Sequence, residues 1–128
     1  MDLVNKSKYN IILGSGSSRR KELLGMTGIN FSVMSIPVDE SFPDSLKGTE
    51  ISEYIVKNKS DAFKKLIKEN EIIITADTLV WFENKCLGKP KDKKEAKYML
   101  KLFAGKSHDV ITSVGFLTIS NFKILTDR

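Results

Sequence analysis

The chain has 128 residues, of which 41% are hydrophobic and 29% are charged, and its formal net charge is +5. This balance is typical of a folded domain and excludes a disordered chain. One cysteine excludes an internal disulfide, and one histidine excludes a histidine-rich metal site. No apolar run approaches the roughly 18 residues of a membrane span, and residues 1–10 lack the apolar core of a signal peptide. We therefore expect a soluble, cytoplasmic protein with no membrane contact.

Strand-like and helix-like segments alternate along the chain, as judged from the period at which apolar residues recur. The predicted strands span residues 9–13, 31–36, 72–76, 79–82, 110–118 and 122–125. The predicted helices span 18–26, 49–70 and 92–103, and turns are expected at 77–78, 84–85 and 88–90. This order predicts a single α/β domain over residues 1–128, with a mixed sheet flanked by helices.

The loop between the first strand and the first helix has the composition of a phosphate-binding loop. Gly14 and Gly16 let the backbone approach a ligand closely, and Ser17 can cap the helix that follows. Arg19 and Arg20 then place two guanidinium groups at a helix N-terminus, which itself favours anions. The alternative is an ordinary connector followed by a solvated first turn. The spacing is that of neither a Walker A loop nor a GxGxxG fingerprint.

A lysine interrupts the apolar face of the second predicted helix. Ile51, Ile55, Ala62 and Leu66 share one face at helical spacing, and Lys59 lies within that stripe. An inward-facing ammonium is costly unless it meets an anion or extends past the apolar surface to water. Two interpretations stay open: a structural contact with a carboxylate, or a cleft in which Lys59 contacts phosphate.

Three further charged positions stand out. Asp77 lies between two apolar runs, where a hairpin turn would favour Gly or Asn, and strand ends are where open α/β sheets place ligand chemistry. Asp39 and Glu40 lie on a loop and supply carboxylates for a hard divalent cation such as Mg²⁺. Lys89 is held between a glycine and a proline. Each also has an ordinary structural or solvated interpretation.

Three features resemble functional motifs but are set aside. Residues 105–107 (GKS) end like a Walker A loop, but the glycine required five positions earlier is replaced by Leu100. The lysines of the third helix lie opposite its apolar stripe, which predicts a packed helix and no nucleic-acid contact. His108 beside Asp109 has no activated Ser or Cys in a recognisable motif and is interpreted as structural.

Taken together, these segments resemble the Maf (septum-formation) family of nucleoside triphosphate pyrophosphatases, and the resemblance covers nearly the whole chain. The matching motifs are, in chain order, residues 13–24 (LGSGSSRRKELL), 38–40 (VDE), Lys59, 76–78 (ADT), 87–90 (LGKP) and 105–112 (GKSHDVIT).

The resemblance implies a Maf/ITPase-like mixed sheet with a nucleotide cleft, and hydrolysis of a nucleoside triphosphate to monophosphate and pyrophosphate. It implies a divalent cation, Mg²⁺ or Mn²⁺, with Glu40 and Asp77 as metal ligands. Asp77 would activate the attacking water, and Glu40 would hold the metal or the water. Lys59 counts among the catalytic residues. The triphosphate would be held by Ser15, Arg19, Arg20, Lys59 and Lys89. Thr78 points to dTTP and UTP, including modified nucleotides, as substrates.

Two departures from the family pattern accompany the resemblance. Gly14 and Ser18 replace the usual alanine and proline, and the sequence stops at Arg128, whereas the family continues through a Lys-Ala-Gly-Ala-Tyr-Gly-Ile-Gln-Gly-like motif. We therefore expect the N-terminal part of a Maf-like protein. The alternative function is a catalytically incomplete nucleotide-binding or cell-division-linked interaction protein. A homodimer is compatible with the sequence, which does not fix the oligomeric state.

Overall fold

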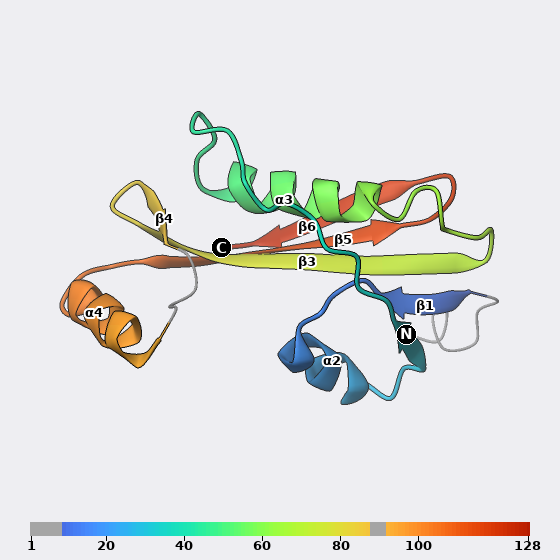
Figure 1. Ribbon diagram of the computed structural model, residues 1–128, viewed down its shortest axis with the longest axis horizontal. Coiled ribbons are helices and arrows are strands. Elements are labelled where there is room, and N and C mark those ends of the chain that lie inside the picture. The colour runs from blue at the N-terminus through green and yellow to red at the C-terminus, as the bar shows by residue number, and fades with distance from the viewer. Residues whose placement is uncertain (1–8, 88–91) are drawn as a thin grey trace.

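The computed structural model describes residues 9–87 and 92–128, and Figure 1 shows the arrangement of its elements. The elements are β1 Asn10–Leu13, α2 Ser18–Gly25, β2 Phe31–Val33, α3 Thr49–Asp61, β3 Glu71–Phe82, β4 Lys85–Leu87, α4 Lys93–Phe103, β5 Asp109–Leu117 and β6 Phe122–Asp127. The expected α/β class with a mixed sheet is confirmed. No helix in the described part of the chain is long and apolar enough to cross a lipid bilayer.

The six strands form one mixed sheet. Its order is β2-β1-β3-β5-β6, with β4 pairing to β3 as well. β1 runs parallel to both β2 and β3, whereas β4 and β5 run antiparallel to β3 and β6 runs antiparallel to β5. The long strands β3 and β5 pair over nine residues and form the centre of the sheet.

β1 and β4 lie along the same edge of β3 and leave a gap between them. β1 pairs with β3 as far as Leu13, opposite Ile74, and β4 begins to pair at Val80. Within the described residues, the β3 edge at residues 75–79 therefore has no neighbouring strand on this side. The loop that follows β1 emerges at this gap. A crevice beyond the end of a parallel strand is where open α/β sheets bind ligands.

Helix α3 covers one face of the sheet and builds the core with it (Figure 1). Two clusters of buried apolar side chains lie under this helix and the turn that follows it. One consists of Ile12, Phe63, Ile73 and Leu117, and the other of Ile51, Ile55, Leu79 and Ile111. Two buried hydroxyl pairs also join α3 to the sheet. Ser52 Oγ lies 2.7 Å from Ser113 Oγ, and Ser60 Oγ lies 2.7 Å from Thr75 Oγ1.

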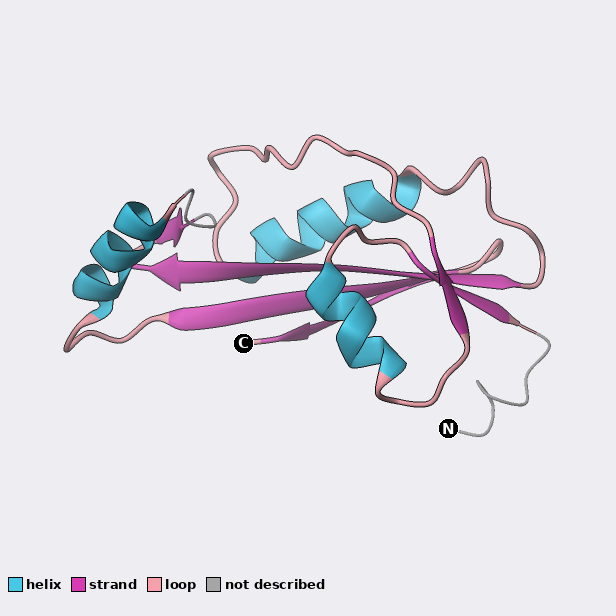
Figure 2. Cartoon of the chain, turned by 60° about the horizontal axis from the view of Figure 1, so that its bottom comes forward, coloured by secondary structure: helices cyan, strands magenta, loops and turns pink. Residues whose placement is uncertain are grey.

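The opposite face of the sheet also carries apolar side chains, and some of them are exposed. Because strand side chains alternate between faces, Leu13, Val33, Ile74, Val114 and Leu125 project away from α3. Of these, Val33 is 43% exposed and Leu125 is 66% exposed. Figure 2 shows α2 and α4 on this side, separated by a stretch of β3 and β5 with no helix over it.

The predicted turn at residues 77–78 is wrong, because β3 continues through it as one twelve-residue strand. Asp77 and Thr78 pair in register with Ser113 and Thr112 of β5, and this pairing keeps the backbone extended there. The hairpin turn predicted at 84–85 falls at residues 83–84, where both residues have positive φ (48° and 62°), as a tight hairpin turn requires. Lys85, predicted to lie in the turn, begins β4.

Several predicted boundaries and faces also differ. The helix predicted over 49–70 ends at Asp61, because the chain tightens into turns that carry Phe63 into the core. Leu66 is consequently 56% exposed rather than part of an apolar stripe. β2 is limited to three residues. Leu100, an apolar residue of the third helix, is 69% exposed.

Candidate functional site

A cavity of about 710 Å³ lies at the gap beside β3. Polar and charged side chains from β3, α3 and the loop after β1 line one part of it, and apolar side chains near β4 line the rest. Its lining residues are Ser15, Gly16, Ser17, Arg20, Glu40, Phe42, Ile55, Lys59, Asp77, Thr78, Leu79, Val80, Cys86, Leu87 and Met99. The cavity thus combines cations, carboxylates and an apolar wall, which are the contacts that a nucleotide needs.

Lys59 reaches from α3 to the centre of this site. Its Nζ lies 3.0 Å from Glu40 Oε1 and 3.7 Å from Asp77 Oδ1, and it donates a hydrogen bond of 3.0 Å to the Ala76 carbonyl. Only 19% of the side chain is exposed, so the two carboxylates and the carbonyl replace most of the water around the ammonium. The contact with carboxylates is confirmed, and Lys59 also lines the cavity, where contact with phosphate stays a prediction.

Asp77 is positioned by strand β3 and not by a turn. It lies in the middle of β3 with its side chain on the α3 face, and the residue is 8% exposed. Glu40 approaches Lys59 from the loop before α3. Its neighbour Asp39 accepts a 2.9 Å hydrogen bond from the backbone N–H of Ser41, and this bond lowers the pKa of Asp39. Of the two loop acids, Glu40 is therefore the one that faces the site.

The Gly/Ser loop is held in shape by its own serines. The Ser17 hydroxyl accepts a 3.2 Å hydrogen bond from the backbone N–H of Arg20 and so caps α2. Ser15 Oγ accepts a 3.1 Å hydrogen bond from the backbone N–H of Ser17. Arg20 extends from the first turn of α2 toward β3, where its Nη2 lies 3.4 Å from Thr78 Oγ1.

The four cations predicted to surround one hollow do not all meet there. Lys59 and Arg20 line the cavity. Arg19 does not, because its Nη1 is paired with Glu22 Oε1 at 3.4 Å on the surface. Exposed pairs of this kind contribute only about 0–1 kcal/mol, so Arg19 can leave Glu22 at little cost. Lys89 lies outside the described residues. His108 is exposed and does not belong to the lining.

The structure adds residues that the sequence did not identify. Ile55, Phe42, Cys86 and Met99 form much of the apolar wall. Thr112 of β5 lies directly opposite Thr78, and their hydroxyl oxygens are 3.1 Å apart. Only the register between β3 and β5 shows this neighbour, and single-sequence patterns do not fix that register.

Glu40 and Asp77 are the carboxylates of the site that would hold a divalent cation, with further oxygens supplied by a ligand. Within the described residues, no group of three or more His, Cys, Asp or Glu side chains could hold a metal by itself. Glu40 and Asp77 nevertheless converge on the same ammonium, so their oxygens are directed at one small volume. Two carboxylates completed by phosphate oxygens are a usual environment for Mg²⁺.

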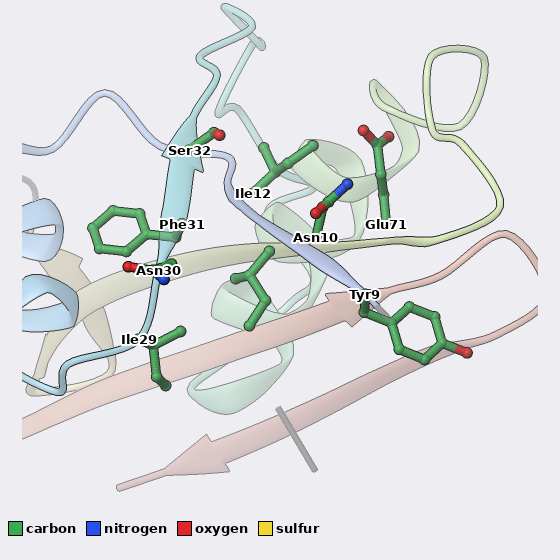
Figure 3. A pocket seen from close by; sticks show the side chains of 9 residues that line it. Tyr9, Asn10, Ile12, Ile29, Asn30, Phe31, Ser32 and Glu71 are labelled. Atoms are coloured by element: carbon green, nitrogen blue, oxygen red, sulfur yellow. The ribbon is translucent and has the colours of Figure 1, made fainter. Parts of the chain in front are cut away.

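A second hollow, of about 550 Å³, lies at the other end of β1 (Figure 3). Its lining consists of Tyr9, Asn10, Ile11, Ile12, Ile29, Asn30, Phe31, Ser32 and Glu71. No lysine or arginine belongs to this lining, and Glu71 adds a negative charge. The second hollow is therefore unsuited to a polyphosphate, and it contains none of the residues predicted from the sequence.

Comparisons with known proteins identify the family of this chain. The family model described as Maf-like protein matches residues 10–126. A dTTP/UTP pyrophosphatase of Bacteroides thetaiotaomicron is 48% identical over 117 residues, which are 91% of this chain and 61% of that protein. A dTTP/UTP pyrophosphatase of Flavobacterium johnsoniae is 43% identical over 120 residues, which are 94% and 62% of the two chains. The chain thus spans about three fifths of the length of these relatives.

Two solved structures share the fold. The Ham1 protein of Staphylococcus aureus superposes with a TM-score of 0.63 at 16% identity, over 91% of this chain and 68% of that one. A nucleoside-triphosphatase, or dITP/XTP pyrophosphatase, of Mycobacterium abscessus gives a TM-score of 0.58 at 11% identity. The match covers 92% of this chain and 71% of that one. The family match over nearly the whole chain and the close relatives lead to one conclusion: this chain belongs to the Maf family.

Proposed function

We propose that this chain hydrolyses a nucleoside triphosphate, dTTP or UTP, to the monophosphate and pyrophosphate. The observation that carries the proposal is the placement of Lys59 between Glu40 and Asp77, in a cavity that the Gly/Ser loop and Arg20 also line. The names of the relatives support the choice of substrate. Because the chain spans about three fifths of their length, its activity is the first thing to test.

The proposed reaction is attack of water on the α-phosphorus. Asp77 takes a proton from the water, a bond forms between the water oxygen and the α-phosphorus, and the bond from that phosphorus to the bridging oxygen breaks. Pyrophosphate then leaves with the bonding electrons. Lys59 and Arg20 supply positive charge for the phosphate oxygens as negative charge shifts onto the leaving group.

The remaining residues bind and orient the substrate in this proposal. Ser15 and the backbone of the Gly/Ser loop contact phosphate oxygens, with Arg19 joining them after release from Glu22. Lys89 is assigned to the triphosphate on the family resemblance alone. Thr78 lines the cavity next to Arg20 and is assigned to the nucleoside on the family resemblance.

A divalent cation, Mg²⁺ or Mn²⁺, would be held by Glu40 and Asp77 together with phosphate oxygens. When bound, it would neutralise negative charge on the triphosphate. Glu40 is less buried than Asp77, with side chains 56% and 11% exposed, and can therefore move more easily from Lys59 to the cation.

Pyrophosphate release from each common nucleoside triphosphate, with and without Mg²⁺, tests the proposal directly. We expect turnover of dTTP and UTP that requires the cation. Asp77→Asn removes the base at nearly constant volume and should lower kcat by about 10²–10⁴-fold. Asp61→Asn is a matched control, because Asp61 pairs with Lys57 and Lys64 on the surface and lies outside the cavity. Binding of nucleotide by the wild type without turnover would instead favour a catalytically incomplete nucleotide-binding protein.

A further inference from the structure

A row of polar side chains crosses the sheet beside the cavity. Arg20 Nη2 lies 3.4 Å from Thr78 Oγ1 on β3, and Thr78 Oγ1 lies 3.1 Å from Thr112 Oγ1 on β5. Asp127 of β6 is the register partner of Thr112, so its side chain stands next along the same face. The row begins with a cation and ends with an anion.

Either hydroxyl of the Thr78–Thr112 pair can donate, and the charges at the two ends of the row favour one direction. A guanidinium can only donate, so Thr78 Oγ1 accepts from Arg20. A carboxylate only accepts, and Asp127 is the register partner of Thr112. With the Thr112 proton turned toward Asp127, the Thr112 oxygen is available as an acceptor for Thr78 on β3. The single proton of Thr78 is then directed to Thr112. Thr78 consequently presents its remaining acceptor lone pair, and no proton, on its cavity side.

The orientation of the Thr78 hydroxyl has a consequence for base selection. Uracil and thymine carry a hydrogen on N3 and can donate from it, whereas N3 of cytosine has no hydrogen and can only accept. A threonine oxygen that offers only lone pairs can bond the first two bases and meets a lone pair on the third. Thr78 lines the cavity, whereas Thr112 does not.

We propose that Thr112 is a specificity-determining positioning residue, which fixes the Thr78 hydroxyl as an acceptor and so favours nucleobases with a ring N–H donor over cytosine. This inference rests on the proposed function, which brings a pyrimidine nucleotide into the cavity. Thr112 acts only through Thr78 and does not touch the substrate.

The test measures binding rather than turnover, so that it does not depend on catalysis. Calorimetric Kd values are measured for α,β-methylene analogues of UTP and CTP with wild type, Thr112→Val and Thr112→Ser. Wild type should prefer the uridine analogue by about tenfold, the equivalent of about 1.4 kcal/mol. Thr112→Val keeps the side-chain shape but removes the acceptor, which frees the Thr78 proton, and the preference should shrink to about threefold or less. Thr112→Ser retains a hydroxyl and should restore the wild-type ratio.

Two further variants separate this role from a general effect on the fold. Thr118→Val makes the same chemical change just after β5, where the Thr118 hydroxyl bonds within the turn to Asn121, and should leave the ratio unchanged. Asp127→Asn removes the negative end of the row at an exposed position and should lower the ratio in the same direction as Thr112→Val. This variant also keeps the test valid where Thr112→Val does not fold.

The outcomes are distinguishable. A Thr112→Val protein that binds both analogues with the wild-type ratio, or weakens both by one factor, overturns the inference alone. An unchanged ratio in Asp127→Asn also counts against it. Wild type that binds neither analogue overturns the proposed function and this inference together. Binding with the expected ratios but without pyrophosphate release supports the inference and contradicts catalysis only.

Discussion

The environment of Lys59 explains why a lysine lies on the apolar face of α3. Burying most of an ammonium costs several kcal/mol unless anions and acceptors replace its water. Glu40, Asp77 and the Ala76 carbonyl do so here, from two different segments of the chain. The sequence predicted that an inward lysine needs an anion, and the contacts confirm this. A phosphate role for Lys59 stays a prediction.

Cys86 gives a chemical probe of the same cavity. Its thiol lines the cavity, and its pKa is raised, first by burial and second by the negative charge of Asp77. A raised pKa means less thiolate at a given pH below it, so we expect Cys86 to react with iodoacetamide at pH 8 more slowly than free cysteine does. Bound nucleotide should slow the reaction further by covering the thiol. The measurement is the rate of modification, followed by mass spectrometry.

Removal of the charge on Asp77 should affect this rate in a predictable direction. Asp77→Asn leaves burial unchanged but removes the second cause of the shift, so the pKa of Cys86 should fall and modification at pH 8 should accelerate. Asp61→Asn, which neutralises an acid outside the cavity, should leave the rate as it is. Modification as fast as that of free cysteine in the wild type would contradict the burial of the thiol.

Gly14 shows that one departure from the family pattern has a packing reason. A Cβ built on Gly14 would lie 2.8 Å from Phe63 Cε2 and 2.9 Å from Phe63 Cζ, closer than real side chains approach. The ring of Phe63 occupies the space that the family's usual alanine would need. Ser18, at the other departure, begins α2 and follows the capping serine. We find no packing reason for Ser18.

At the scale of the elements, hydrophobic periodicity predicted most strands and helices but not where they end. In isolation, residues 77–78 resemble a turn. Their pairing with Ser113 and Thr112 of β5 nevertheless keeps β3 continuous. Conversely, apolar residues continue at helical spacing beyond Asp61, the last residue of α3. The helix nevertheless ends there, because Phe63 turns into the core. Both errors arise because tertiary pairing and packing override local pattern.

The packing of α3 on the sheet depends on a glycine in β5. A Cβ on Gly115 would lie 2.6 Å from Val56 Cγ1 of α3 and 2.9 Å from Thr75 Oγ1 of β3. Gly115→Ala should therefore push α3 outward and lower the free energy of unfolding by about 1–3 kcal/mol. Urea denaturation followed by circular dichroism measures this change.

Gly25 provides the matched control for that substitution. It lies in the last turn of α2, and an added Cβ would meet nothing within 4 Å. Gly25→Ala should leave stability unchanged or raise it by up to about 1 kcal/mol, because alanine loses less backbone entropy on folding. Equal unfolding midpoints for both alanine variants would show that the contact between α3 and β5 is looser than described.

For the molecule as a whole, most polar residues of the site could be predicted from the sequence. The residues that contact them from other strands could be found only from the folded structure. The loop after β1, Lys59, Glu40 and Asp77 were all predicted, and the fold brings the three charged groups together. Arg19 was predicted to join them but pairs with Glu22. Thr112 escaped notice because its importance depends on lying opposite Thr78, across 34 residues of sequence.

The sheet face opposite α3 leads to a prediction about the 128-residue polypeptide itself. Val33 on the edge strand β2 and Leu125 on the edge strand β6 are 43% and 66% exposed there, whereas Leu13 on β1 is 3% exposed. Exposed apolar side chains on a sheet face bind hydrophobic dyes. We therefore expect the folded polypeptide to enhance the fluorescence of anilinonaphthalene sulfonate in buffer without denaturant.

Substitution within that face should remove the dye binding without unfolding the protein. Val33→Lys with Leu125→Lys places two charges among the apolar side chains and should lower the fluorescence at least about twofold, because charged groups keep water at the surface. Leu66→Lys is the matched control, since Leu66 is 56% exposed but follows α3, away from this face. Thermal unfolding should be nearly the same for all three proteins, because exposed positions contribute little to stability. Dye fluorescence that the double substitution leaves unchanged would mean that the sheet face is covered in solution.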